Sequence, residues 1–103
     1  MKEIAVHITP RLLEVMDKKK ARHIALEVAS SNASDFEVTE LYLRFVSEKT
    51  AAYLTGKKRY QALPTERGLL LLPPYRLVYG DELTLDYESA LFLHHITCKG
   101  VSL

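Results

Sequence analysis

The sequence predicts a single α+β domain made mainly of antiparallel strands, with one amphipathic helix near the N-terminus. Three observations carry this prediction. Most segments alternate between apolar and polar residues with the period of two that half-buried strands show. One early segment has helical periodicity between two good capping signals. The 103 residues are 48% hydrophobic and 26% charged, which is the size and balance of one compact domain over residues 1–103.

The first two elements are a strand over residues 3–8 and a helix over residues 10–20. Thr9 can cap the helix, and Pro10 at its first position loses only an N–H that would otherwise be unpaired. Leu12, Leu13 and Met16 form an apolar stripe along one side. These features predict a helix that packs its stripe against a sheet.

Two alternating segments follow, at residues 22–30 and 36–46, joined by a small polar loop over residues 30–35. The simplest arrangement is an antiparallel pair, with one change of phase near Glu40. Ser47 and Gly56 then bound a short helix over residues 47–54. Residues 60–65 are predicted to be irregular because Pro64 interrupts a strand ladder.

The C-terminal third predicts three more pieces of sheet. Residues 69–72 form a fully apolar strand. Residues 75–79 and 82–87 are predicted to pair as a hairpin around Gly80 and Asp81, since Gly-Asp suits a two-residue turn. Residues 90–98 supply a last, strongly apolar strand.

Composition excludes several classes of protein. The formal net charge is +1, so no overall field attracts nucleic acid or an anionic membrane. The longest apolar run, residues 69–74, is far shorter than the ~20 residues of a membrane helix. The first ten residues lack the apolar stretch of a signal peptide, and one cysteine cannot form an intrachain disulfide. We therefore expect a cytoplasmic protein with no membrane attachment.

The candidate metal ligands are His94, His95 and Cys98. Imidazole and thiolate are ligands of zinc and similar metals. In a strand, however, His94 and Cys98 share one face about 13 Å apart, at ~3.3 Å per residue, and His95 lies on the other face. A metal site would therefore need two subunits. The alternative is a strand whose histidines are held by ordinary hydrogen bonds.

No catalytic arrangement is evident, and the sequence predicts a protein that is not an enzyme. Cys98 lacks a glycine-rich turn that could supply an oxyanion hole. Four carboxylates alternate with apolar residues as the solvated face of a hairpin would. These are Asp81, Glu82, Asp86 and Glu88. The nucleotide-binding and zinc-protease motifs are missing as well.

Two features point to partners. The basic groups Lys18, Lys19, Lys20 and Arg22, and Lys57, Lys58 and Arg59, could bind phosphates, with Tyr53 and Tyr60 stacking on bases. The near-zero net charge makes nucleic acid the less favoured partner. Tyrosines are enriched at protein interfaces, and the apolar last strand needs a cover. We therefore predict a homodimer or another protein partner, with Tyr75, Tyr79 and Phe92 as interaction residues.

The order of elements resembles the HesB-like fold of the A-type iron-sulfur carriers. The resemblance is carried by Ile-Thr-Pro-Arg-Leu-Leu at residues 8–13, Leu-Arg-Phe-Val-Ser-Glu at 43–48 and Leu-Thr-Leu-Asp-Tyr at 83–87. It implies a cluster held by one cysteine in the loop between the paired strands and by a Cys-x-Cys pair near the C-terminus. Here the loop has no cysteine, and Cys98 stands alone. No family ligand carries over.

These observations together predict a non-catalytic, self-associating interaction domain of HesB-like fold that has lost its cluster-binding cysteines and has no cofactor. One alternative is a zinc or iron-sulfur protein that uses His94, His95 and Cys98 across a dimer. A second alternative is nucleic-acid binding through the two basic groups.

Overall fold

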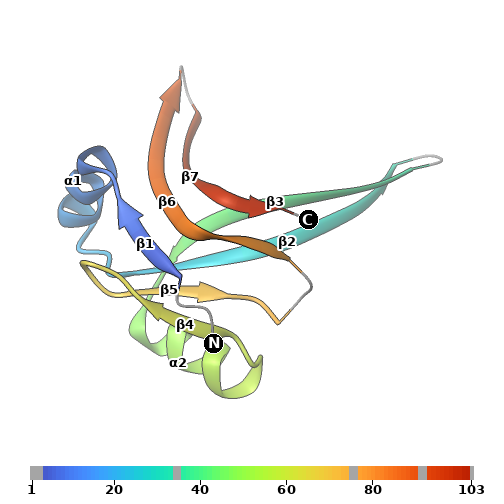
Figure 1. The fold of residues 1–103 in the computed structure, drawn as a ribbon, viewed down its shortest axis with the longest axis horizontal. Coiled ribbons are helices and arrows are strands. Elements are labelled where there is room, and N and C mark those ends of the chain that lie inside the picture. The colour runs from blue at the N-terminus through green and yellow to red at the C-terminus, as the bar shows by residue number, and fades with distance from the viewer. Residues whose placement is uncertain (1–3, 34–35, 75–76, 91–92, 103) are drawn as a thin grey trace.

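The computed structural model describes residues 4–33, 36–74, 77–90 and 93–102, which form a sheet and two helices (Figure 1). The elements are β1 (Ala5–Ile8), α1 (Pro10–Lys19), β2 (His23–Ala33), β3 (Phe36–Val46), α2 (Glu48–Lys57), β4 (Gln61–Pro64), β5 (Leu69–Leu72), β6 (Val78–Ala90) and β7 (Leu93–Ser102). Within the described ranges, neither helix has the length and apolar character that a membrane crossing requires.

The sheet contains seven strands in the order β1-β6-β7-β3-β2-β5-β4 and is mixed. β1 runs parallel to β6 and β2 runs parallel to β5, whereas the other pairings are antiparallel. The predicted predominance of antiparallel strands is confirmed. The short helix predicted over residues 47–54 is present as α2 and is capped by Ser47, but it is longer than predicted, with 10 residues, and passes through Gly56.

Helix α1 closes the inner side of the curved sheet. The Thr9 hydroxyl caps it by accepting a hydrogen bond from the Leu12 N–H, as predicted. Leu12 and Met16 are fully buried against the inward side chains of the strands. The inner core consists of Ile8, Leu12, Met16, Ile24, Leu26, Leu70, Leu72, Leu83, Leu85 and Ile96.

Helix α2 covers the opposite, outer face of the sheet. Ala51 and Leu54 of α2 pack with Ala25, Val46 and Leu71 in a second, smaller core. Strand β5 therefore lies between the two cores, with Leu70 and Leu72 inward and Leu71 outward. Burial on both faces explains why residues 69–72 show no polar alternation.

The predicted hairpin around Gly80 and Asp81 is wrong. These residues lie inside β6, which runs without a turn from Val78 to Ala90 and pairs with β7. The pairing shifts register between Tyr79 and Thr84. At this irregularity Gly100 of β7 adopts φ of +103°, and a Cβ there would collide with the Glu82 carbonyl oxygen. The glycines thus permit a bulge between two long strands, where the sequence suggested a turn.

Three other boundaries differ from the predictions. Residues 61–64 form β4, which tolerates Pro64 because β4 is the edge of the sheet. Strand β2 continues through the predicted loop to Ala33, and its ladder with β3 is unbroken, so there is no change of phase at Glu40. Strand β7 begins and ends later than predicted.

Two hairpins extend beyond the rest of the sheet, as Figure 1 shows for β2 with β3 and for β6 with β7. We call these outer parts the arms: the β2–β3 ladder beyond Val28 and Leu41, and the β6–β7 ladder beyond Tyr87 and Ile96. The Cα radius of gyration is 14.0 Å, against about 13 Å for a compact domain of this length. The accessible surface is 7418 Å², against about 5,900 Å² for a compact monomer of this mass.

Candidate functional site

Strand β7 holds the predicted metal ligands and places them on both faces of the sheet. His94 Nδ1 lies 2.7 Å from the Ser89 hydroxyl, and its ring stacks near Tyr87 with centroids 6.2 Å apart. His95 Nε2 lies 3.4 Å from a carboxylate oxygen of Glu88. Each exposed histidine therefore interacts with its own cross-strand neighbours on β6.

Cys98 lies opposite Leu85 of β6 and packs against the inner core. Burial raises the pKa of the Cys98 thiol to about 11. The thiol without a bound metal is therefore protonated at neutral pH, and a protonated thiol is a weak nucleophile.

The predicted interaction residues have different outcomes. Tyr75 and Phe92 lie outside the described residues. The ring of Tyr79 packs against the inner core, and its hydroxyl is buried without a hydrogen-bond partner among the described side chains. Burial raises the pKa of Tyr79. Tyr79 thus contributes mainly to the core of the β6–β7 hairpin.

Asp86 was predicted to lie on a solvated face with Asp81, Glu82 and Glu88, but its carboxylate is engaged by hydrogen bonds. Its Oδ1 accepts hydrogen bonds from the Thr9 hydroxyl at 2.7 Å and from the Tyr87 N–H at 2.7 Å. Arg11 adds an ion pair at 2.9 Å. The hydrogen bonds from Thr9, Arg11 and Tyr87 lower the pKa of Asp86 to about 2. This carboxylate therefore fastens the N-terminus of α1 to β6.

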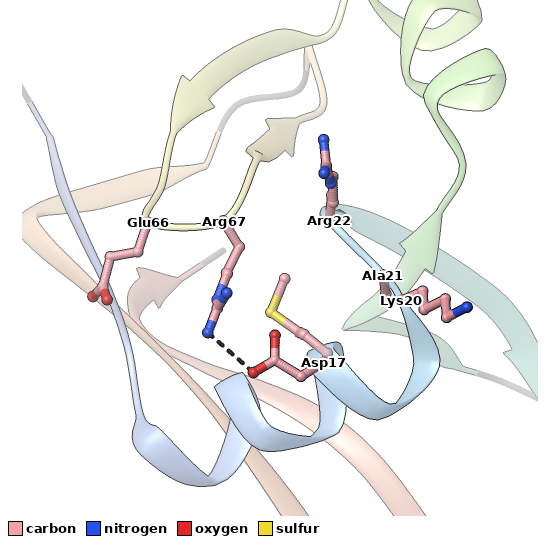
Figure 2. Close-up of a pocket in the computed structure, with 7 residues that line it drawn as sticks. Asp17, Lys20, Ala21, Arg22, Glu66 and Arg67 are labelled. Carbon is pink, nitrogen blue, oxygen red and sulfur yellow. Dashed lines mark hydrogen bonds and ion pairs between the residues drawn. The ribbon is translucent and has the colours of Figure 1, made fainter.

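The first basic group borders a crevice between the end of α1 and the β4–β5 turn (Figure 2). The crevice has a volume of about 590 Å³ and is lined by Met16, Asp17, Lys20, Ala21, Arg22, Glu66 and Arg67. Arg67 pairs with Asp17 at 3.0 Å. Figure 2 shows Lys20 and Arg22 pointing away from this pair, so their charges do not converge on one ligand position.

His23 lies next to this crevice and was not predicted from the sequence. Its side chain is 10% exposed, and its Nδ1 accepts a hydrogen bond from the Leu69 N–H at 3.1 Å. A Cβ on Gly68 would collide with the Arg22 carbonyl oxygen, so Gly68 permits this close approach. A glycine just before an apolar strand is the sequence signal for such an approach. The arrangement fixes the position of β5 against β2.

The second basic group, Lys57, Lys58 and Arg59, lies at the C-terminal end of α2. Lys20 and Arg22 border a second pocket at the N-terminal end of the same helix, beside Ser47. A helix of 10 residues is about 15 Å long. The structure therefore separates the two basic groups. Tyr53 and Tyr60 accompany the second group in a third pocket.

Comparison with known proteins gives one finding about the fold. The sequence matches no protein-family model and no curated protein. A solved structure that it resembles is the crystal structure of Escherichia coli SufA, a protein involved in biosynthesis of iron-sulfur clusters. The match covers 93% of this chain and 80% of that chain, with a TM-score of 0.51 and 15% identity. The chain has the SufA fold. The HesB-like resemblance is thereby confirmed at the level of the fold.

The residues of this chain do not fit the iron-sulfur cluster that the HesB-like resemblance implies. A cluster needs about four thiolate-type ligands. This chain has one cysteine, and the pKa of its thiol is raised. His94 and His95 lie on opposite faces of β7. Among the described residues, no three side chains of histidine, cysteine, aspartate or glutamate are grouped as metal ligands would be.

Proposed function

We propose that this protein of SufA fold is a non-catalytic interaction domain that works as a homodimer, with a second copy covering its arms. The observation that carries the proposal is the excess surface. The chain exposes 7418 Å², about 1,500 Å² more than a compact monomer of its mass. A stable interface buries about 800 Å² on each partner. Covering the arms would supply that area.

A groove at the base of the arms exposes several apolar side chains that a second copy could cover. Strands β3 and β7 pair only at Leu43 and Ile96 within the described ranges, so the two hairpins diverge from that point. The groove of about 290 Å³, with both apolar and polar lining, opens there. It is lined by Leu26, Leu41, Leu43, His95, Ile96, Thr97, Cys98 and Val101.

A second copy fits this groove better than an unrelated partner does. Two-stranded ribbons are marginally stable in water, so each chain has two arms that gain from a third strand or an apolar cover. A twofold axis would let each copy cover the other with the same surface, which closes the assembly. The formal net charge of +1 leaves little repulsion between copies.

The state of the thiol supports a role without chemistry. Nucleophilic catalysis and metal ligation both use the thiolate. At pH 7 a Cys98 thiol with a pKa of about 11 is ionised to the extent of only about one part in 10,000. The groove that contains Cys98 is therefore better suited to packing than to reaction.

The self-association is tested by size-exclusion chromatography with light scattering at tens of micromolar. We expect twice the chain mass for the wild type and the chain mass for Leu41→Asp, which places a charge in the groove. Tyr53→Asp is the matched control because Tyr53 is 52% exposed on α2, away from the arms. It should remain dimeric. A monomeric wild type would contradict the proposal.

The absence of a resident metal is tested separately by elemental analysis of protein purified without a histidine tag. We expect zinc and iron well below one per chain, both as isolated and after anaerobic incubation with iron and sulfide. Stoichiometric metal that disappears in Cys98→Ser would contradict the proposal and support the cross-dimer metal site.

A further inference from the structure

A pocket on the outer face of the sheet combines aromatic rings with positive charge. It lies between the C-terminal half of α2 and strands β2 and β3, on the side of the sheet away from α1. Its volume is about 390 Å³. The lining residues, which we call the tyrosine pocket, are Glu27, Val28, Arg44, Tyr53, Leu54, Lys58, Tyr60 and Pro74.

Glu27 organises one wall of the tyrosine pocket. It accepts a hydrogen bond from the Tyr42 hydroxyl at 2.6 Å and another from Arg44 Nε at 2.8 Å. Burial would raise the pKa of Glu27, but the hydrogen bonds from Arg44 and Tyr42 outweigh it and lower the pKa. Glu27 is therefore charged and fully engaged, and it holds a half-exposed guanidinium and a tyrosine ring in place.

The other wall presents a ring and a cation. Tyr53 is 52% exposed, and the Lys58 ammonium lies 5.9 Å from the centroid of its ring. That distance is near the ~6 Å limit of a cation–π contact, so the contact is weak. A planar group that stacks on Tyr53 can displace the Lys58 ammonium, which then remains beside the stacked group.

The charge of this region is distinctly positive although the whole chain is nearly neutral. Arg44 and Lys58 line the pocket, and exposed Lys57 and Arg59 flank it, against the single carboxylate of Glu27 in the lining. The crevice at α1 has similar cations, but it mixes them with Asp17 and Glu66 and lacks an aromatic ring in its lining. The tyrosine pocket therefore combines a stacking surface with more cations than carboxylates in its lining.

We propose that the tyrosine pocket binds a nucleotide unit of single-stranded nucleic acid, with a base stacked on Tyr53 and a phosphate at Lys58. Base stacking on aromatic side chains together with a basic groove is the usual means of holding single strands without sequence preference. Tyr60 and Leu54 complete the apolar side of the pocket. The inference goes beyond self-association and does not depend on it.

The test is fluorescence anisotropy of a labelled oligonucleotide of about eight thymidines or uridines, titrated with the full chain at low and rising salt. We expect binding that weakens as salt rises. Tyr53→Ala should weaken binding by about tenfold or more, whereas Tyr53→Phe should retain it. Lys58→Gln should weaken binding and lower the slope of log affinity against log salt by about one.

Lys99→Gln is the matched control, because it removes the same charge from an exposed position on β7 outside both basic groups and should leave the affinity nearly unchanged. Titration with a mononucleotide as competitor distinguishes single-stranded nucleic acid from free nucleotides as the ligand. If it binds as tightly as the oligonucleotide and is lost in Tyr53→Ala, the site is assigned to free nucleotides. The proposal is overturned if neither ligand binds at low salt. It is equally overturned if Tyr53→Ala binds as well as the wild type.

Discussion

The inner ends of the two long hairpins and their arms use the same kind of ladder but have very different surroundings. At the inner ends, β6 lies between β1 and β7, and β2 lies between β3 and β5. Helix α1 also covers β6, so Leu83 and Leu85 are completely buried. In the arms each strand pairs only with its hairpin partner among the described strands. The inner ends therefore have strand neighbours on both edges, whereas the arms have a neighbour on one edge.

The comparison shows that a ladder is stabilised mainly by what covers its faces. Backbone hydrogen bonds exchange for bonds to water, so each contributes only about 1 kcal/mol net. Burial of apolar side chains contributes more, and the inner ends have most of it. Under the proposed function, a second copy supplies this contribution to the arms.

The sharpest test of this comparison is Leu83→Ala beside Leu41→Ala. Leu83 has 0% exposure, so its truncation should lower the free energy of unfolding by about 2–5 kcal/mol. Leu41 lines the open groove and is only partly buried, so its truncation in dilute protein should cost about 1 kcal/mol or less. Urea titration followed by circular dichroism measures both.

Raising the protein concentration sharpens this result. If a second copy covers the arms, the cost of Leu41→Ala grows with concentration, because dimerisation stabilises the folded chain by mass action. The cost of Leu83→Ala relative to the wild type should change much less. Equal costs for the two truncations in dilute protein would show that the arms are as well supported as the inner ends.

The next effect concerns the bulge in the β6–β7 ladder, which lies at the side of the inner end away from the arm. Gly100→Ala should destabilise the chain by more than about 1 kcal/mol, because φ is +103° and the new Cβ would meet the Glu82 carbonyl. Gly56→Ala is the matched control, since nothing lies within 4 Å of its Cβ position in α2. It should leave stability unchanged or raise it by up to about 1 kcal/mol. Thermal melts distinguish them.

The smallest expected effect is on the thermal stability at low pH. The pKa of Asp86 is about 2, below its ordinary value of 3.8, so its contribution to stability is complete above about pH 4 and is lost as the pH falls towards 2. Asp86→Asn should have a lower Tm at pH 6 and a shallower fall in Tm between pH 4 and 2. Glu66→Gln, in an exposed position of the β4–β5 turn, should follow the wild type. An unchanged acid profile in Asp86→Asn would remove its role in fastening α1.

Local patterns predicted those elements whose determinants are local. Thr9 and Pro10 start α1, and its apolar stripe faces the core, as the sequence suggested. The alternation in β2 and β3 predicted their pairing. The prediction of a turn at Gly80 was wrong because the irregularity there depends on Gly100, which is distant in sequence but adjacent in the sheet. A two-residue turn and a bulge use the same glycine chemistry.

The candidate sites show the same division between features set by neighbouring residues and features set by residues distant in sequence. Alternation placed His94 and His95 on opposite faces, and Tyr53, Tyr60 and Lys58 were grouped by proximity along the chain. The partners of Asp86 and His23 lie 77 and 46 residues away, so only the fold reveals them. The contribution of Glu27 to the tyrosine pocket likewise depends on the register of β2 with β3.

The outermost strands of the described sheet, β1 and β4, have 4 residues each, and β4 ends in Pro64. Such short borders offer few free amides for a further chain, and proline offers none. The long edges without a partner among the described strands are those of the arms, since β2 pairs with β5 only at Ile24 and Ala25. Copies that cover each other's arms would therefore leave no long edge on which fibrils could grow. The protein can associate through one surface without becoming prone to form amyloid, and concentrated solutions should stay clear.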